Sequence, residues 1–514
     1  MVAAAHPLAA EAGATVLRLG GGAVDAAIAV QMVLGLVEPE ASGLGGGAFM
    51  LHWSAKEKKL RAYDGREIAP ASSSPALFLD RDGKPMPFMA AAASGRSVGV
   101  PGVLRMLEMA YQRHGRLRWA ELLQYAIFAA EEGWPMSARL HAQLEKETHL
   151  RNDPQARAIF YGADGRPRPV GARLTNRAYG ATVRTLAFEG VEAFYRGPIA
   201  ADIARAVRTH AKPGGLTEED LAAYRAVERD PLCGPYRQWR VCSMPPPSSG
   251  GVAVLQILGM LERTEFPSQP AGSEKALHLY AEASRLAYAD RARFIGDPDF
   301  VSVPTAALVD GKYLEKRAAL IGERAIGLAP SGDPEAAGTT HFTIVDAEGD
   351  VVSMTSTIEA TFGSRIMVRG FLLNNELTDF DFTPNSRNEV EPRKRPRSSM
   401  APTIVFGPAG EVRLAVGSPG GPFIIHYVAK ALIGTLGWNL PMAEAIGLPN
   451  FSNRNGATEV ERGSAYEALS DALRARGHEV VLRELTSGLH GVERIPGGWR
   501  GAADPRRGGA AFGE

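Results

Sequence analysis

The chain has 514 residues, enough for one large core or for two to three smaller ones. Lys and Arg balance Asp and Glu, so the formal net charge is zero and neither a nucleic-acid surface nor an acidic tail is indicated. No run of eighteen apolar residues occurs, so no transmembrane helix is expected. Residues 1–6 lack the charged and apolar regions of a signal peptide, so we expect either a cytoplasmic chain or a leader left out of this sequence.

The first third of the chain is predicted to be helical. Residues 9–38 are alanine-rich, with an interruption at Gly20–Gly22, and residues 103–132 form a second long helical pattern. Between them, Gly43–Gly47 superficially resembles a dinucleotide-binding loop. Because residues 48–53 read as a strand and not as the start of a helix, we reject that interpretation. A third helix is predicted over residues 274–293.

The two cysteines, Cys233 and Cys242, are too few for a disulfide framework and lack metal-ligand spacing. They flank Gly234–Tyr236, which could turn a hairpin, so one bridge stays open as an alternative. Two separate core thiols are the favoured interpretation, by about two to one. The histidines are scattered, with no HExxH motif and no paired spacing, so we expect no metal site.

The last third of the chain changes character. Short β-branched segments between turns predict strands over residues 342–346, 351–358, 403–406 and 412–416. Helices and strands segregated in this way favour an α+β fold with helices layered on sheets. The segment Ile326–Gly338 is rich in Gly, Pro, Ala and Ser and has no apolar period, so it is predicted to be a flexible break.

A β-hairpin is predicted directly after this break. In Asp346–Asp350, Gly349 suits the left-handed position of a three-residue loop, and this turn sets a register in which Thr339 faces Thr357. For an arbitrary hairpin, a row of Thr and Ser is the wet face of the strand pair in about nine cases of ten. The preceding break favours the alternative, in which Thr339 becomes a new N-terminus by self-cleavage. The polar row consists of Thr339, His341, Thr343, Ser353, Thr355 and Thr357.

Other polar residues lie next to predicted turns. Val416–Gly421 lacks the glycine of a nucleophile elbow, but two of its backbone N–H groups could form an oxyanion hole. Taken singly, the charged and hydroxyl residues beside these turns are typical of solvated surface. Together they would bind an α-amino acid through both its carboxylate and its ammonium group. They are Arg66, Ser398 and Ser399 for the carboxylate, and Glu376 and Asp379 for the ammonium.

These segments resemble the γ-glutamyltranspeptidase family over essentially the whole chain. The resemblance implies an N-terminal nucleophile hydrolase with an αββα four-layer sandwich, no metal or organic cofactor, and self-cleavage between Gly338 and Thr339. The parts 1–338 and 339–514 would then be two fragments intertwined as one globular unit. The matching motifs are Gly43–Gly47, Asp64–Glu67, Met244–Gly251, Gly296–Phe300, Thr339–His341, Thr357–Gly363, Arg395–Met400, Gly417–Gly421 and Asp504–Arg506.

The resemblance also implies a role for each site residue. Thr339 would be the nucleophile and Thr357 its partner hydroxyl, acting on a γ-glutamyl amide such as glutathione with water, an amino acid or a peptide as acceptor. It implies a periplasmic or extracellular protein, with a cytoplasmic one as the alternative. The α-carboxylate would be bound by Arg66, Ser398 and Ser399, the α-amino group by Glu359, Glu376 and Asp379, and the oxyanion by Gly420 and Gly421.

Two departures from the family pattern affect the expected reaction. Glu359 and Glu376 stand where many relatives carry Asn and Gln. Only the eighteen residues 380–397 separate Asp379 from Ser398, too few for a lid over the pocket. An open site favours hydrolysis and leaves open a glutaryl-7-aminocephalosporanic acid (cephalosporin) acylase of the same fold. A non-processing binding pseudoenzyme is the alternative from another class, and the intact Gly338, Thr339 and Thr357 argue against it.

Overall fold

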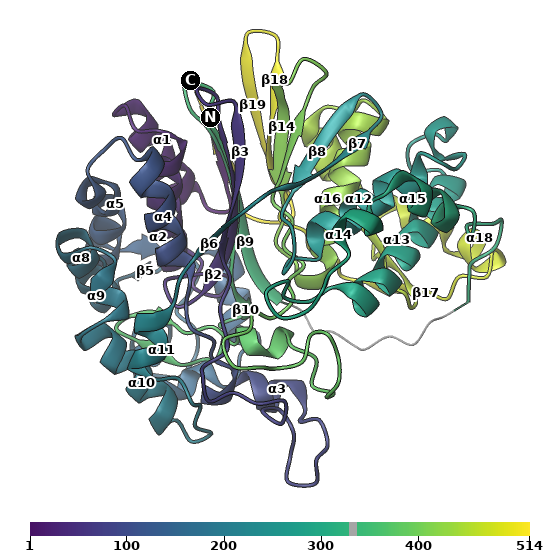
Figure 1. The fold of residues 1–514 in the computed structure, drawn as a ribbon. Coiled ribbons are helices and arrows are strands. Elements are labelled where there is room, and N and C mark those ends of the chain that lie inside the picture. The colour runs from purple at the N-terminus through teal and green to yellow at the C-terminus, as the bar shows by residue number, and fades with distance from the viewer. Residues whose placement is uncertain (328–336, 514) are drawn as a thin grey trace.

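The computed structural model describes residues 1–327 and 337–513 as four layers, in which two central sheets are covered by helices on their outer faces (Figure 1). This is the α+β sandwich expected from the sequence. The first sheet has seven antiparallel strands. In spatial order they are β20 (Ala510–Phe512), β1 (Val2–Ala4), β9 (Ala337–Val345), β10 (Val351–Ala360), β2 (Gly47–Ser54), β3 (Lys59–Gly65) and β6 (Val227–Arg229).

The second sheet has six antiparallel strands, and three small sheets lie outside the two large ones. Its strands in spatial order are β19 (Gly498–Ala503), β18 (His490–Ile495), β14 (Val412–Gly417), β13 (Thr403–Phe406), β8 (Trp239–Ser243) and β7 (Leu232–Tyr236). The small sheets pair β4 (Trp134–Pro135) with β5 (Arg173–Leu174), β11 (Met367–Val368) with β12 (Phe371–Leu372), and β15 (Phe451–Asn453) with β16 (Thr458–Glu461) and β17 (Val480–Arg483).

The helices before residue 230 mostly cover the outer face of the first sheet, on the left of Figure 1. They are α1 (Pro7–Arg18), α2 (Ala23–Val37), α3 (Phe88–Ala92), α4 (Val103–His114), α5 (Trp119–Glu132), α6 (Ala138–Lys146), α7 (Pro154–Phe160), α8 (Arg177–Glu189), α9 (Glu192–Tyr195), α10 (Pro198–Thr209) and α11 (Glu218–Ala223). The helices on the right are α12 (Gly250–Leu261), α13 (Glu274–Phe294), α14 (Thr305–Leu308), α15 (Gly311–Ala318), α16 (Ile424–Leu432), α17 (Met442–Gly447) and α18 (Ser470–Ala475).

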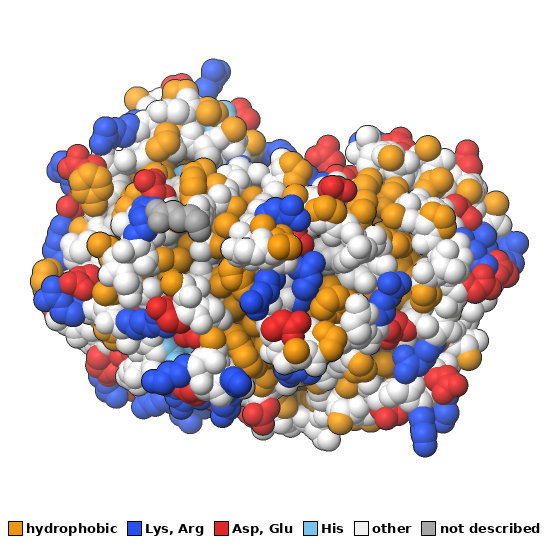
Figure 2. Space-filling model, turned by 90° about the horizontal axis from the view of Figure 1, so that it is seen from above, with side chains coloured by type: hydrophobic (Ala, Val, Ile, Leu, Met, Phe, Trp, Pro, Cys, Tyr) orange, Lys and Arg blue, Asp and Glu red, His pale blue; other side chains and the backbone are white. Residues whose placement is uncertain are grey.

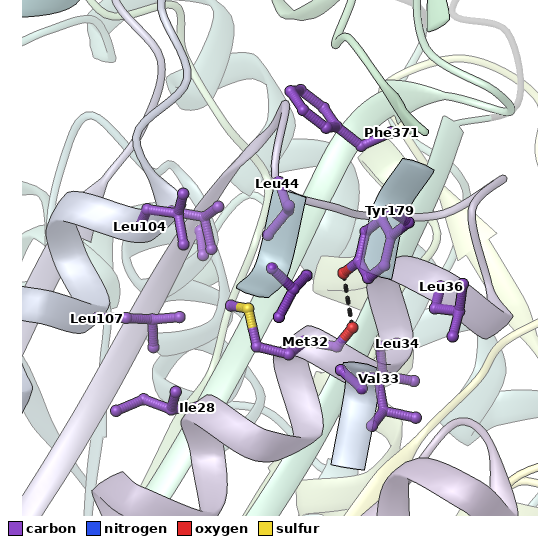
Figure 3. Packing of buried hydrophobic residues seen from close by; sticks show 14 of the residues in the cluster. Ile28, Met32, Val33, Leu34, Leu36, Leu44, Leu104, Leu107, Tyr179 and Phe371 are labelled. Carbon is purple, nitrogen blue, oxygen red and sulfur yellow. Dashed lines mark hydrogen bonds between the residues drawn. The ribbon is translucent and has the colours of Figure 1, made fainter. Parts of the chain in front are cut away.

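Helix α2 forms the centre of the first helical layer. All of its residues are buried, which explains why its sequence, apart from Asp25 and Gln31, is apolar on every side instead of amphipathic. In Figure 3, Met32 and Leu34 of α2 pack among Leu44, Leu104 and Tyr179. The Tyr179 hydroxyl donates a hydrogen bond of 2.7 Å to the Met32 carbonyl, so the one polar group of this side chain is satisfied inside the core.

The predicted helices are present, with one correction. Residues 9–38 form α1 and α2, separated at the predicted glycines, and residues 274–293 form α13. Residues 103–132 are not one long helix but two, α4 and α5, with a break after Gly115. The carboxylate of Asp25 accepts hydrogen bonds from the backbone N–H groups of Arg116 and Leu117, which stabilises the chain in this non-helical turn.

The interpretation of the two cysteines as separate thiols is wrong. Strands β7 and β8 form a hairpin in which Cys233 pairs directly with Cys242, and their sulfur atoms are bonded. The hairpin turns at residues 237–238, after Tyr236, and not at Gly234–Tyr236 as the sequence suggested. A directly paired position brings the two Cα atoms to 4.1 Å, close enough for a bridge.

The expected division at residue 338 runs through the middle of the first sheet. Strand β9 crosses the Gly338–Thr339 bond, and each of the two sheets contains strands from both sides of that bond. Most of the predicted break 326–338 lies outside the described residues. At its start, the Ile326 N–H donates to the Glu282 carboxylate over 2.6 Å, and at its end β9 begins at residue 337.

The surface carries both signs of charge in a mixed arrangement. On the face seen in Figure 2, Lys and Arg side chains are interspersed with Asp and Glu, in keeping with a formal net charge of zero. Across the described parts of the chain, no helix combines the length and apolar content needed to cross a bilayer.

Candidate active site

Thr339 lies in β9 directly opposite Thr357 in β10, in the register predicted from the turn. Gly349 adopts φ +85°, the left-handed conformation expected for it. The Thr339 hydroxyl donates to the Thr357 hydroxyl over 3.3 Å, and Thr339 is only 2% exposed. Two hydroxyl groups are therefore held together in a place that bulk water hardly reaches.

The polar row around Thr339 is not a wet face. Its six side chains are buried because they face the second sheet, where Thr343 donates to the His490 carbonyl and Ser353 to the Val416 carbonyl. Gly417 makes room for the row: a Cβ at this position would lie 2.2 Å from Cε1 of His341. The row is the polar seam between the two sheets, and Thr339 lies at its end.

Thr357 connects the Thr339 hydroxyl to the peptide bond before it. Its hydroxyl donates a hydrogen bond of 2.8 Å to the Gly338 carbonyl and accepts one of 2.8 Å from the Glu359 N–H. A β-bulge follows Thr357, and Glu359 adopts φ +76°, which is strained for a side-chain-bearing residue. The Gly338 carbonyl thus accepts a hydrogen bond from the same hydroxyl that contacts the Thr339 hydroxyl.

The backbone around this bond is tightly packed. A Cβ on Gly338 would lie 2.5 Å from the Glu40 carbonyl oxygen, so only glycine fits there without rearrangement. Gly46, in the loop that superficially resembled a dinucleotide site, would place a Cβ 2.1 Å from the Thr357 carbonyl oxygen. That loop leads into β2, and its glycines allow the chain to pass close to β10.

A second charged cluster lies on the other side of Thr339, and the sequence did not predict it. The Thr340 hydroxyl donates to Glu38 over 3.0 Å, and Arg507 donates to the Thr339 carbonyl over 3.3 Å. Burial, together with the neighbouring Glu38, raises the pKa of Glu40 to about 7. The one feature of the sequence that pointed to this cluster was the motif Asp504–Arg506, which ends one residue before Arg507.

The predicted site residues line one small cavity of about 30 Å³. That volume is little more than a single water requires. Nine of the predicted residues line it: Arg66, Thr339, Thr357, Glu359, Glu376, Asp379, Ser398, Ser399 and Gly421. Gly420 adjoins the lining without being part of it, and the sequence did not predict the lining residues Arg291, Met400, Pro422 and Ile424.

Arg66 does not stand apart from the acids but is paired with them. Its guanidinium forms ion pairs with Glu376 and with Asp379, the second at 2.5 Å, and is 1% exposed. Nε donates to the Pro396 carbonyl and Nη2 to the Arg397 carbonyl. Burial alone would lower the pKa of Arg66, but the carboxylates of Glu376 and Asp379 raise it above its ordinary value.

Two glutamates of the cavity, Glu359 and Glu376, have raised pKa values because they are buried close to other acids. Burial, opposed by Arg66 and reinforced by Asp379, raises the pKa of Glu376 to about 7. Burial and the charges of Asp379 and Glu376 also raise the pKa of Glu359 well above its usual range. The Glu359 carboxylate is held by the Asn375 side chain, which the sequence did not predict. Such a site gains stability when a cation enters it.

Ser398 and Ser399 are held by the proline- and serine-rich turn that precedes α12. The Ser249 N–H and hydroxyl both donate to the Ser398 carbonyl, at 2.8 and 2.6 Å. The Met400 N–H donates to the Ser398 hydroxyl over 3.1 Å, and Arg291 donates to the Ser399 hydroxyl over 2.9 Å. Both serine hydroxyls are thus oriented by donors, which leaves their own protons available.

Gly420 and Gly421 follow β14 and begin the turn η5 (Gly421–Phe423), which packs against β9. Their φ angles are +134° and +53°, values that favour glycine. Within the described residues, neither backbone N–H donates to a protein acceptor. Two unpaired backbone N–H groups in one turn are the kind of donors from which an oxyanion hole can be formed.

Two further observations concern other kinds of site. A wider hollow of about 1420 Å³ lies at the end of the sheets where the termini meet, lined by Trp53, Trp499 and Phe512 among others, and it includes none of the predicted site residues. Among the residues that the structure describes, no three His, Cys, Asp or Glu side chains gather closely enough to hold a metal ion.

Comparisons with known proteins identify the family of this chain. A family model described as gamma-glutamyltranspeptidase matches residues 9–514. The chain is 37% identical to a glutathione hydrolase proenzyme of Bacillus subtilis (strain 168), with 100% of this chain and 91% of the relative covered. It is 38% identical to the glutathione hydrolase proenzyme of Escherichia coli (strain K12), with 98% and 90% covered. Among solved structures, a cephalosporin acylase from Bacillus halodurans superposes with a TM-score of 0.89 at 27% identity, covering 100% of this chain and 96% of the other. The chain therefore belongs to the γ-glutamyltranspeptidase family.

Proposed function

We propose that this protein is a γ-glutamyl hydrolase and transpeptidase that cuts itself between Gly338 and Thr339 and then uses Thr339 as its nucleophile. The observation that carries the proposal is the chain of hydrogen bonds from the Thr339 hydroxyl through Thr357 to the Gly338 carbonyl. It ends in a cavity whose acids, serines and arginines suit an α-amino acid.

Self-cleavage begins with attack of the Thr339 hydroxyl on the Gly338 carbonyl carbon. The C–N bond breaks, an ester forms on the Thr339 oxygen, and the backbone nitrogen becomes an amine. Water then hydrolyses the ester and leaves a Gly338 carboxylate and a free Thr339 hydroxyl. The fragments 1–338 and 339–514 remain together because both contribute strands to both sheets.

The new α-amine of Thr339 acts as the base for its own hydroxyl. Such an amine has a pKa of about 7.7–8.0, which suits proton transfer near neutral pH. The hydroxyl attacks the γ-carbonyl of a γ-glutamyl amide such as glutathione, the oxyanion binds the N–H groups of Gly420 and Gly421, and the amine product leaves. Water, an amino acid or a peptide resolves the acyl-enzyme, and no cofactor takes part.

The acids of the cavity select the ammonium group of the substrate. Asp379, Glu376 and Glu359 form the acidic side of the cavity. Because burial raises the pKa values of the two glutamates, a cationic ligand would stabilise their charged forms. Arg66 pairs with Glu376 and Asp379 but supplies only one positive charge for the acids. A substrate without the ammonium leaves the remaining negative charge uncompensated, which favours γ-glutamyl over glutaryl compounds.

Cephalosporin acylase activity is the second candidate function. The superposition on the Bacillus halodurans acylase over the whole chain and the short segment 380–397 support an open site that admits bulky amides. Turnover of a γ-glutamyl anilide should be compared with that of its glutaryl analogue. Faster turnover of the glutaryl compound would replace the main proposal with this one.

Processing separates an enzyme from a binding pseudoenzyme. Intact mass and N-terminal sequencing of purified protein should reveal a second chain that starts Thr-Thr-His-Phe, absent from the Thr339→Ala variant. A single uncut chain in both proteins would refute self-cleavage.

We also propose a periplasmic or extracellular location, because the Cys233–Cys242 bond persists best in an oxidising compartment. Cell fractionation tests the location.

A further inference from the structure

The motif Asp504–Arg506 lies outside the cavity that contains Thr339, and the proposed mechanism does not use it. Asp504 is 1% exposed, and both oxygens of its carboxylate accept hydrogen bonds. Oδ1 accepts from the backbone N–H and the guanidinium of Arg506, at 3.0 and 3.2 Å. Burial alone would raise the pKa of Asp504, but the hydrogen bonds from Ser487 and Arg506 and the charges of Arg506 and Lys430 lower it below its ordinary value. Asp504 is therefore a carboxylate at neutral pH.

The other oxygen of Asp504 fixes the backbone on both sides of Gly488. Oδ2 accepts from the hydroxyl of Ser487, which precedes this glycine, and over 3.3 Å from the N–H of Leu489, which follows it. The Asp504 N–H in turn donates to the Leu489 carbonyl over 2.8 Å. One buried carboxylate thus determines where the backbone of Gly488 lies.

Asn450 supplies a second anchor for the same stretch of chain. Its Nδ2 donates to the Leu485 carbonyl over 2.7 Å and to the Ser487 hydroxyl over 2.9 Å, and its Oδ1 accepts from Lys430 over 2.8 Å. Residues 485–489 form no helix or strand, yet buried polar side chains hold them at both ends. We call these residues the anchored segment.

The anchored segment packs against the turn that leads to Gly420 and Gly421. It precedes β18, which pairs with β14, and this turn follows β14, so the two chains lie side by side. The Gly488 N–H donates to the Ser418 hydroxyl over 3.4 Å, and a Cβ on Gly488 would lie 2.7 Å from Cγ of Pro419. Because Pro419 directly precedes Gly420, the position of Gly488 limits where the two glycine N–H groups can point.

The anchored segment also reaches the backbone of the nucleophile. A Cβ on Gly488 would lie 2.6 Å from Cδ of Arg507. The guanidinium of Arg507 donates to the Thr339 carbonyl over 3.3 Å and to the Thr486 carbonyl over 3.4 Å. The anchored segment therefore lies between the backbone that carries the nucleophile and the turn that carries the two unpaired N–H groups.

We propose that Asp504 is a positioning residue for the oxyanion hole. It acts through the anchored segment, which holds the turn before Gly420 in a fixed place relative to Thr339. The inference rests on the proposed function, because an oxyanion hole serves a reaction in which the attacked carbonyl oxygen becomes negatively charged. The competing explanation is that Asp504 only stabilises the fold. In that case its loss would reduce the amount of folded protein and leave the kcat of the folded enzyme unchanged.

Asp504→Asn tests the proposal, because an amide nitrogen cannot accept the hydrogen bonds that one carboxylate oxygen accepts. The oxyanion forms only during the reaction, so we expect kcat on a γ-glutamyl anilide to fall about 10- to 100-fold while KM changes less than about threefold. Rates are divided by the concentration of folded, self-cleaved enzyme. Ser487→Ala removes only one contact of Asp504, and its kcat should fall about 3- to 10-fold. The matched control is Asp471→Asn, whose side chain is 96% exposed and whose kcat should equal that of the wild type.

Binding of L-glutamate, a product of the proposed reaction, separates the oxyanion hole from the rest of the cavity. Calorimetric titration should give the same dissociation constant for the wild type and for both variants, within about threefold, because the product needs no oxyanion donor. A wild-type kcat in folded Asp504→Asn, or a rise in KM with kcat unchanged, would overturn the proposal.

Hydrogen exchange measured by mass spectrometry needs no catalysis. The Phe423 N–H donates to the Gly420 carbonyl over 3.1 Å, so a peptide covering residues 417–423 reports on the turn. We expect this peptide to exchange about threefold or more faster in Asp504→Asn than in the wild type or Asp471→Asn, while peptides from α2 exchange equally in all three. Equal exchange of the turn would contradict the proposal. If the wild type cleaves no anilide but the turn exchanges as expected, the proposed function fails and the positioning by Asp504 stands.

Discussion

Replacing Thr357 with valine tests the link between the nucleophile and the scissile bond. Valine has nearly the same shape as threonine but lacks the hydroxyl, which donates 2.8 Å to the Gly338 carbonyl and lies 3.3 Å from the Thr339 hydroxyl. Removing one donor from a carbonyl under attack typically slows a reaction by about 100- to 1000-fold. We expect self-cleavage of Thr357→Val to slow by this factor.

The same substitution also affects stability, and this effect must be kept separate. It leaves the Gly338 carbonyl without a donor and the Glu359 N–H without an acceptor, and each unsatisfied buried group costs about 1–3 kcal/mol. Thermal unfolding of the uncut protein gives the temperature range in which the variant is folded. Cleavage rates should be compared only within that range.

The assay follows newly synthesised protein on a denaturing gel. Scaling the 54.8 kDa chain by residue count gives fragments of roughly 36 and 19 kDa. Thr357→Ser is the matched control: it keeps the hydroxyl but loses the methyl group that restricts its rotamer, so we expect it to slow cleavage less than about tenfold. A folded Thr357→Val protein that cuts itself at the wild-type rate would refute the role of this hydroxyl.

Three other substitutions test separate parts of the structure. Glu376 is neutral below its pKa of about 7, and ammonium binding needs the carboxylate, so KM for a γ-glutamyl anilide should fall as the pH rises from about 6 to about 8. The Glu376→Gln variant should lose this pH dependence of KM. An unchanged pH profile in the variant would argue against a role of Glu376 in ammonium binding. Gly417→Ala should destabilise the protein by about 1–3 kcal/mol in chemical unfolding, since its Cβ would meet His341, whereas Gly498→Ala, with open space around it, should not. Replacing both Cys233 and Cys242 by serine in one variant should lower the free energy of unfolding by about 2–3 kcal/mol and leave kcat unchanged. Equal stability of the variant and the wild type would mean that the disulfide bond does not form in solution.

The sequence was most informative where local rules determine geometry. A turn with glycine in the left-handed position determined the register of β9 and β10, and the side-chain period of two then determined that Thr339 faces Thr357. Arg66 and Glu376, which are far apart in sequence, were singled out as charged residues beside predicted turns, and the family resemblance then implied that they share one site. The structure brings them into contact, which no spacing rule could have shown.

The remaining features depend on contacts between distant segments. Arg291 reads in the sequence as one charged residue near the end of a long helix, and only the folded chain reveals that it faces Ser399. The Cys233–Cys242 bond depends on the strand pairing that follows from the position of the turn. A wet face stayed open as an alternative for the polar row, because the second sheet that covers the row cannot be inferred from the hairpin alone.

The pairing of β1 with β20 has a consequence for how this chain could be connected. Val2 lies directly opposite Phe512 in an antiparallel ladder, while the bond proposed for cleavage lies in β9, the next strand on the other side of β1. A short linker between the two ends would preserve every strand pairing, so the order of the two parts could be exchanged. Such a circular permutant would begin at Thr339 and present the α-amine of the nucleophile without any peptide bond having been cut.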